Sequence, residues 1–214
     1  MLELLIGSKN YSSWSLRPWL SLKHKEIPFK EVVISMHQAT WREQARSRSP
    51  NGKVPMLQDG ALQVPESLAI LEYIAECFPA AQLWPKDLAA RATARAVSAE
   101  MHSGFAHLRQ EMSVNILARK NVVPSDKACA DIARIEALWA ECRTRFGAAG
   151  PFLFGEFSNA DAMFAPVVTR FVTYEIPVSE ATQAYMATIL ALPAMEAWIQ
   201  GAQEEAARGE GGYR

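Results

Sequence analysis

The sequence predicts an α/β unit followed by an all-α unit. Residues 1–80 alternate between short extended runs and helical runs, whereas the periodic runs after residue 87 are helical. Between the two units, the segment FPAAQLWPKD (78–87) carries Pro79 and Pro85 and is typical of a linker. We therefore expect domains at 1–80 and 88–214, joined by a linker at 81–87.

The composition is that of a globular protein. The 214 residues are 50% hydrophobic and 21% charged, which is enough to bury a sizeable core. The net charge of −1 argues against nucleic acid as a partner, and the basic cluster Arg42, Arg46, Arg48 and Lys53 is typical of a solvated loop. No stretch approaches the roughly 20 apolar residues that span a bilayer, and the N-terminus is too short and polar for a signal peptide. We therefore expect no membrane partner.

The three cysteines, Cys77, Cys129 and Cys142, lie far apart in the sequence. They have neither metal-ligand spacing nor a CxxC arrangement. We expect no metal site, three buried and unreactive thiols, and a reducing, cytoplasmic location.

The first unit is expected to follow the order β-α-β-short helix-β-β-α. LELLI (2–6) and FKEVVIS (29–35) have the apolar and β-branched character of strands, and a helical pattern runs from Ser15 to about Lys25. Asp59-Gly60 separates two short apolar runs within 55–64, which predicts a hairpin. An amphipathic helix is predicted at 66–78.

The second unit is expected to be built from helices only. Long helical runs extend from about Leu88 to Ile116 and from about Ser125 to Phe146. The segment 158–172 is apolar nearly all round, so it should be a buried helix, and Ser158 and Asp161 have the spacing of a capping box. A final helix should begin at Pro193.

Three motifs of the first unit occur at informative places. SSWSLR (12–17) lies at the start of the first helix, KVP (53–55) enters the hairpin, and ESLAILEYI (66–74) opens the third helix. The first unit resembles the thioredoxin fold. With these motifs and the buried helix at 158–172, the whole chain resembles a cytosolic glutathione S-transferase. The serine five residues before Arg17, Ser12, is similar to the serine motif of the zeta and tau classes.

This resemblance implies an enzyme that activates glutathione as a thiolate and transfers it to an electrophilic, partly apolar small molecule. Isomerase or peroxidase side activity, a role in detoxification and a homodimer are implied as well. An unperturbed thiol has a pKa of about 8.5, and a hydroxyl that donates a hydrogen bond to the sulfur favours the anion. By the resemblance that hydroxyl belongs to Ser12, with Ser13 as the alternative.

The resemblance also assigns the remaining glutathione contacts. Val54, before a cis Pro55, would pair its backbone with the cysteinyl unit, while Glu66 and Ser67 would hold the γ-glutamyl amino and carboxyl groups. The glycyl carboxylate would meet a side chain drawn from His37, Gln38 and Lys53.

The second substrate would lie against the run 102–115 of the helical unit. Trp14, Phe105, His107 and Glu111 are the candidate contacts. Trp14 replaces a cysteine of the zeta-class motif, which argues against isomerisation of maleylacetoacetate. The alternative to an enzyme is a non-catalytic glutathione-transferase-like binding or scaffold protein, or a carrier of apolar compounds. The presence of Ser12, Val54, Glu66 and Ser67 together favours the enzyme.

Overall fold

A mixed four-stranded sheet organises the first unit in the computed structural model, which describes residues 1–210. Strand β1 (Leu2–Gly7) runs parallel to β2 (Phe29–Ile34) and antiparallel to β3 (Met56–Asp59). Strand β4 (Leu62–Pro65) completes the order β2-β1-β3-β4. The β3–β4 turn contains Gly60 with φ +56°, so the predicted hairpin is confirmed.

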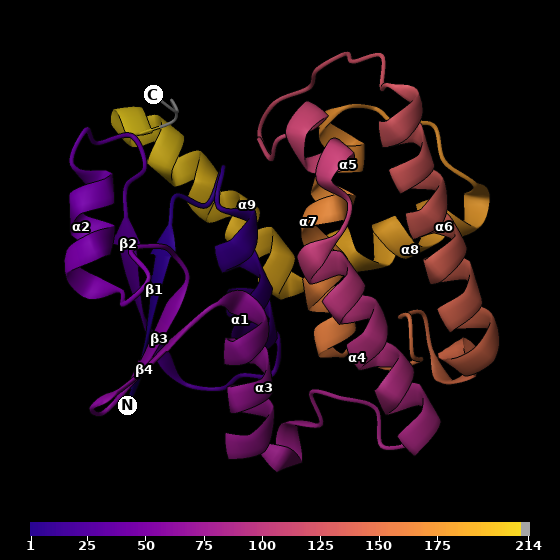
Figure 1. Cartoon of the computed structure of the whole chain (residues 1–214), viewed down its shortest axis with the longest axis horizontal. Coiled ribbons are helices and arrows are strands. Elements are labelled where there is room, and N and C mark those ends of the chain that lie inside the picture. Colours follow the sequence, from indigo (N-terminus) through magenta and orange to yellow (C-terminus); the bar gives the residue numbers. More distant parts are fainter. Residues whose placement is uncertain (211–214) are drawn as a thin grey trace.

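The two faces of the sheet carry different layers. Successive side chains of a strand point to opposite faces. In β1, Leu4 and Ile6 join the main core under α1 (Ser13–His24) and α3 (Ser67–Cys77), whereas Leu5 joins a small second core beneath α2 (Trp41–Arg48). Figure 1 shows α1 and α3 between the sheet and the second unit, with α2 on the outer side. The first helix is therefore held where the two units meet.

The second unit is helical, as predicted. The chain passes through η1 (Pro79–Ala81), α4 (Leu88–Ser103), α5 (Ala106–Glu111), α6 (Asp126–Phe146), η2 (Gly147–Ala149), α7 (Asn159–Thr173), α8 (Glu180–Leu190), α9 (Pro193–Glu205) and η3 (Ala206–Glu210). Helix α7 is buried along almost its whole length, and the capping box between Ser158 and Asp161 is present. Both predictions for this segment are confirmed.

Two expectations are corrected, and one helix has no counterpart among them. The helix predicted to reach Ile116 ends at Ser103, because Gly104 caps it and Phe105 takes a left-handed conformation (φ 58°) that buries its ring in the core. Helix α8 was not predicted. Cys77 and Cys129 are exposed, and only Cys142 among the three cysteines is buried, where desolvation raises its pKa to about 12.

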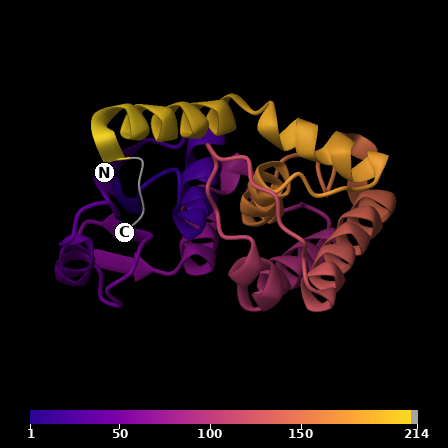
Figure 2. The ribbon, with the colours of Figure 1, turned by 90° about the horizontal axis from the view of Figure 1, so that it is seen from above.

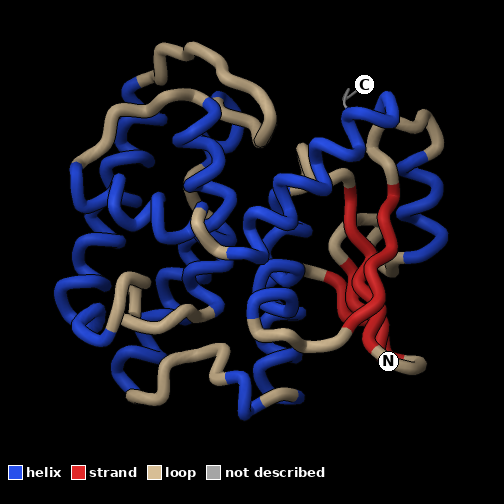
Figure 3. Tube along the Cα trace, turned by 180° about the vertical axis from the view of Figure 1, so that it is seen from behind, coloured by secondary structure: helices blue, strands red, loops and turns tan. Residues whose placement is uncertain are grey.

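The last helix returns from the second unit to the first. Viewed from above, α9 runs across the top of the first unit (Figure 2), and from behind it reaches one end of the sheet (Figure 3). The indole nitrogen of Trp198 donates to the Lys9 carbonyl at 2.9 Å, and the Lys9 amide donates to the Glu205 carboxylate at 2.8 Å. Helix α9 thereby holds the loop that leads into α1.

No helix within residues 1–210 has both the length and the apolar character needed to cross a membrane.

Candidate active site

Two cavities meet at the start of α1. The first cavity, about 360 Å³, lies within the first unit and is lined by residues that include Ser12, Arg42, Arg46, Lys53 and Val54. The second cavity, about 560 Å³, lies between the units and is lined by residues that include Arg109, Asn115, Lys120 and Arg170. Tyr11, Ser13, Trp14 and Met36 line both cavities. The first turn of α1 is therefore the place where two ligands would meet.

The serines at this junction form a short hydroxyl chain. The Ser12 hydroxyl donates to Ser15 Oγ at 2.7 Å, and Ser15 Oγ also accepts from the Gly7 amide at 3.2 Å. A side chain at Gly7 would come within 3.1 Å of Ser12 Oγ, so glycine there lets β1 approach the serines closely. The first-turn amides of a helix lack intrahelical partners and lie at its positive end. This arrangement can stabilise an anion.

The first cavity also has a cationic wall. The Val54–Pro55 peptide is cis, and Val54 lines the cavity. Arg42, Arg46 and Lys53 line the same cavity, so these members of the basic cluster are not simply part of a solvated loop. Such cations can bind a carboxylate.

The loop candidates for that carboxylate lie elsewhere. His37 and Gln38 line neither cavity, and the Gln38 amide oxygen accepts a hydrogen bond from Gln44 at 2.9 Å. Of the three residues predicted for the glycyl carboxylate, the structure brings only Lys53 to the first cavity.

The start of α3 supplies a second polar site. Glu66 precedes the helix with φ 81°, and Ser67 is its first residue. Ser67 is 1% exposed, and within residues 1–210 its hydroxyl has no hydrogen-bond partner. Buried hydroxyls are normally paired, and a helix N-terminus favours an anion. Ser67 and Glu66 together therefore suit a ligand that carries both a carboxylate and an ammonium group.

His102 of α4 joins this site from the second unit. Its Nε2 lies 3.3 Å from Glu66 Oε2, and its ring contacts Trp14 edge-on with centroids 5.3 Å apart. Burial lowers the pKa of His102 below its ordinary value, and Arg17 and Arg109 act in the same direction against Glu66. Sequence analysis assigns no role to His102, although the long helix predicted there would have placed His102 and Arg109 near one face; in the structure α4 ends at Ser103, before Arg109.

Trp14 is surrounded by cations. The guanidinium carbons of Arg17 and Arg109 lie 4.2 and 4.8 Å from the centre of its ring, within the range of cation–π attraction. Trp14 itself lines both cavities.

The other predicted contacts for the second substrate are elsewhere. Phe105 is buried in the core. The Glu111 carboxylate accepts from the Ser125 amide (2.9 Å) and hydroxyl (2.6 Å) at the start of α6, which lowers the pKa of Glu111. Phe105, His107 and Glu111 line neither cavity. The break after α4 explains this, because residues beyond Gly104 no longer follow the face of the predicted long helix.

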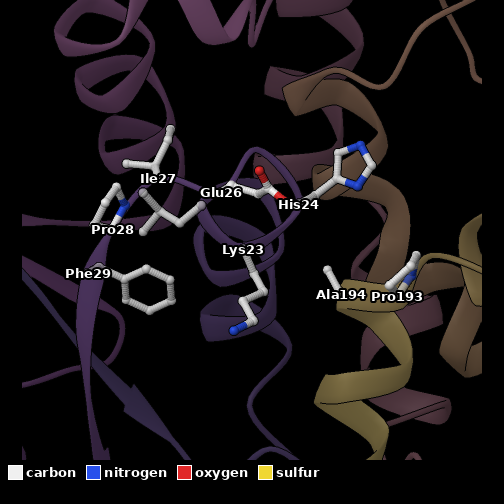
Figure 4. A pocket seen from close by; sticks show the side chains of 9 residues that line it. Lys23, His24, Glu26, Ile27, Pro28, Phe29, Pro193 and Ala194 are labelled. Carbon is white, nitrogen blue, oxygen red and sulfur yellow. The ribbon is translucent and has the colours of Figure 1, made fainter.

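Another cavity, about 590 Å³, lies at the opposite end of α1 (Figure 4). It is bounded by the loop between α1 and β2 and by the start of α9, and its lining includes His24, Phe29 and Pro193. None of the predicted site residues lines it. Within the described chain, no group of three or more His, Cys, Asp or Glu side chains is arranged to hold a metal ion.

Comparison with known proteins identifies the two units. The family model of the glutathione S-transferase N-terminal domain matches residues 11–77, and that of the glutathione S-transferase C-terminal domain matches residues 92–201. A maleylacetoacetate isomerase from Rattus norvegicus is 28% identical over 78% of each chain. A probable maleylacetoacetate isomerase from Caenorhabditis elegans is 34% identical over half of each chain.

Solved structures have the same fold. A glutathione transferase homologue from Burkholderia, solved with bound glutathione, superposes with a TM-score of 0.72 at 23% identity. The match covers 95% of this chain and 98% of the other.

Proposed function

The chain belongs to the glutathione S-transferase family. From this premise we propose that it binds glutathione between the start of α3 and the first cavity, activates its thiol at the start of α1, and transfers it to an electrophile held in the second cavity. Glu66 and Ser67 themselves lie outside the lining of the first cavity. The observation that carries the proposal is the buried, unpartnered Ser67 hydroxyl beside Glu66 at the N-terminus of α3. A γ-glutamyl group offers the carboxylate and the ammonium that this pair lacks.

Glutathione would extend from α3 along the cis turn to the cationic wall. Its γ-glutamyl end would meet Ser67 and Glu66, and its cysteinyl backbone would pair with Val54 beside Pro55. Its glycyl carboxylate would meet Lys53, with Arg42 and Arg46 lining the same cavity. With its two ends placed in this way, glutathione would have its cysteinyl sulfur beside the serines at the start of α1.

Ser12 is the proposed thiolate donor. Its hydroxyl, which donates to Ser15 in the ligand-free protein, rotates about the C–O bond and can donate to a sulfur anion instead. One such bond, together with the helix end, would lower the thiol pKa by one to two units, at about 1.4 kcal/mol per unit. Ser13, which lines both cavities, is the alternative donor.

Trp14 would form the wall between thiolate and electrophile. The names of the curated relatives favour an isomerase side activity, in which the thiolate adds to the substrate and leaves again. The tryptophan in place of the zeta-class cysteine argues for a different electrophile. We propose conjugation as the main reaction, with isomerisation and peroxide reduction as side activities to be measured.

The test is calorimetric titration with reduced glutathione. Ser67→Ala should weaken binding roughly ten- to hundred-fold, because a hydrogen bond to a charged group contributes about 1.5–3 kcal/mol. The same change should not lower stability, because the hydroxyl has no hydrogen-bond partner within residues 1–210.

Ser98→Ala is the matched control. Ser98 is equally buried, and its hydroxyl is also unpartnered within the described residues. Neither serine lines the two cavities, but Ser98 lies inside α4, whereas Ser67 stands at the N-terminus of α3 beside Glu66. Equal losses of affinity in the two variants would overturn the proposal. Absence of glutathione binding by the wild type would favour the scaffold alternative.

We also propose a cytoplasmic homodimer that serves in detoxification. The exposed thiols of Cys77 and Cys129 suit a reducing compartment. Light scattering of the purified protein should give twice the mass of the chain; a monomer would contradict the proposed dimer.

A further inference from the structure

The second cavity carries cations that no carboxylate of its lining balances. Arg109, Lys120 and Arg170 contribute to the lining, and among residues 1–210 no Asp or Glu does. We propose that this cavity selects electrophiles that carry a carboxylate, held by Arg170 and Lys120. The inference rests on the proposed transfer reaction but concerns a different part of the substrate.

Arg170 of α7 is the inner cation. It is 5% exposed, and its guanidinium donates to the carbonyl oxygens of Met112 (2.8 Å) and Pro166 (3.1 Å). Within residues 1–210 it forms no ion pair. Burial, and then the nearby Arg109, lower the pKa of Arg170. Burial of a cation without a counter-charge is unfavourable, so a ligand carboxylate that pairs with Arg170 would offset this cost.

Two further guanidinium groups reinforce this charge. Arg109 donates to the carbonyls of Met101, His102 and Gly104, and burial lowers its pKa. Asp131 raises the pKa of Arg109. The Asp131 carboxylate accepts a hydrogen bond from the Leu108 amide, and Asp131 does not line the cavity.

Arg17 lies behind Trp14 and is 1% exposed. Its Nε donates to the Met163 carbonyl, while its Nη1 has no partner within the described residues. Burial, and then Arg109 and Arg170, lower the pKa of Arg17, so the three guanidinium groups repel one another. An anion bound in the second cavity would relieve that repulsion.

Lys120 is the outer cation. Its backbone amide is held by the Thr173 carbonyl at 2.7 Å, while its exposed side chain forms no hydrogen bond or ion pair with residues 1–210. Glutathione does not need these groups, because the first cavity has its own cations, Arg42, Arg46 and Lys53. The cations of the second cavity are therefore available to the electrophile.

A matched pair of electrophiles tests the inference. Glutathione thiolate attacks the chlorine-bearing carbon of 4-chloro-3,5-dinitrobenzoate or of its methyl ester. The carbon–sulfur bond forms, chloride leaves with the bonding pair, and the thiol proton passes to solvent. After correction for the uncatalysed rates, the wild type should favour the benzoate over the ester in kcat/KM by at least roughly ten-fold, the factor expected of one charge-assisted contact.

Lys120→Gln should lower that benzoate-to-ester ratio by about three- to five-fold, the effect of one exposed charge pair, and Lys120→Glu should lower it further. Lys127→Gln, at an exposed lysine of α6 that lines neither cavity, should leave the ratio unchanged. Added salt should lower the rate with the benzoate more than the rate with the ester. Equal use of the two compounds, or a ratio that does not respond at Lys120, would overturn the inference while leaving glutathione transfer intact.

A binding measurement separates this inference from the proposed function. The unreactive probe 3,5-dinitrobenzoate should bind more tightly than its methyl ester, and so quench tryptophan fluorescence at lower concentration. In Lys120→Glu the concentrations needed for quenching by the acid and by the ester should be closer to each other. The acid should bind more tightly than the ester even if neither chlorinated compound is turned over. Absence of turnover would count against the proposed glutathione transfer and not against the anion site. Equal affinity of the acid and the ester would overturn the anion site.

Discussion

At the residue scale, His102 connects the two units across the proposed glutathione site. Burial lowers the pKa of His102, which favours the neutral imidazole and leaves the Glu66 carboxylate available to an ammonium group. Below that pKa the imidazolium should compete for Glu66. We therefore predict that glutathione affinity falls as the pH drops from 7.5 to 5.5, and that His102→Gln reduces this fall.

Calorimetric titrations at the two pH values check this prediction. Other groups also titrate over this range, so the informative quantity is the difference between wild type and variant. His24→Gln is the control, because His24 also has a pKa lowered by burial but lies in the cavity at the other end of α1. Identical pH dependence in wild type and His102→Gln would exclude the proposed competition.

The sequence motifs indicate those candidate site residues whose positions are set locally. Ser12, Val54 and Ser67 each stand at the start of a helix or in a turn, where a few neighbouring residues define the backbone. Arg109 and Arg170 could not be assigned in this way, because packing of the second unit on α1 brings them to the cavity. Phe105, His107 and Glu111 were chosen on the assumption of one unbroken helix.

At the element scale, Asp161 stabilises the start of α7. Its carboxylate accepts hydrogen bonds from the amides of Leu153 and Ser158 and from the hydroxyl of Tyr185. We predict that Asp161→Ala lowers the free energy of unfolding by about 3 kcal/mol, because it leaves several buried donors unpaired.

Asp87→Ala is the matched comparison. Asp87 also caps a helix, accepting from the Ala90 amide at 2.8 Å, but it is exposed, so its loss should cost only about 1 kcal/mol. Urea unfolding curves measure both values. Equal costs at the two positions would contradict the role assigned to Asp161.

Elements whose signals lie within one segment could be predicted from the sequence, and the others could not. The capping box and the apolar run of α7 lie within one segment, so the sequence alone indicates them. The end of α4 was missed although Gly104 is a typical helix terminator, because the helical composition continues beyond it. Helix α8 was missed because its apolar residues show little periodicity, although Ser179 caps it by accepting from the Thr182 amide.

At the scale of the whole molecule, one core joins the two units. The main cluster includes Leu4 and Ile6 of β1 together with Phe164 and Val168 of α7, and α1 packs directly against α7. We predict that the two units unfold in a single cooperative transition, because neither can leave the other without exposing this shared core.

Native-state hydrogen exchange, read by mass spectrometry, measures this coupling. Peptides that cover β1 and peptides that cover α7 should open with the same free energy, and urea should lower both with the same slope. A β1 that opens several kcal/mol more easily than α7 would show that the first unit unfolds separately.

The central claim is that the start of α1 converts bound glutathione to its thiolate. The most direct measurement is the ultraviolet absorbance of the thiolate against pH, for glutathione bound to the wild type, Ser12→Ala and Ser13→Ala. We predict a bound-thiol pKa one to two units below that of free glutathione in the wild type, loss of most of this shift in Ser12→Ala, and binding by both variants. A wild-type complex whose thiol titrates like free glutathione would contradict the account, and loss of the shift in Ser13→Ala alone would move the role to Ser13.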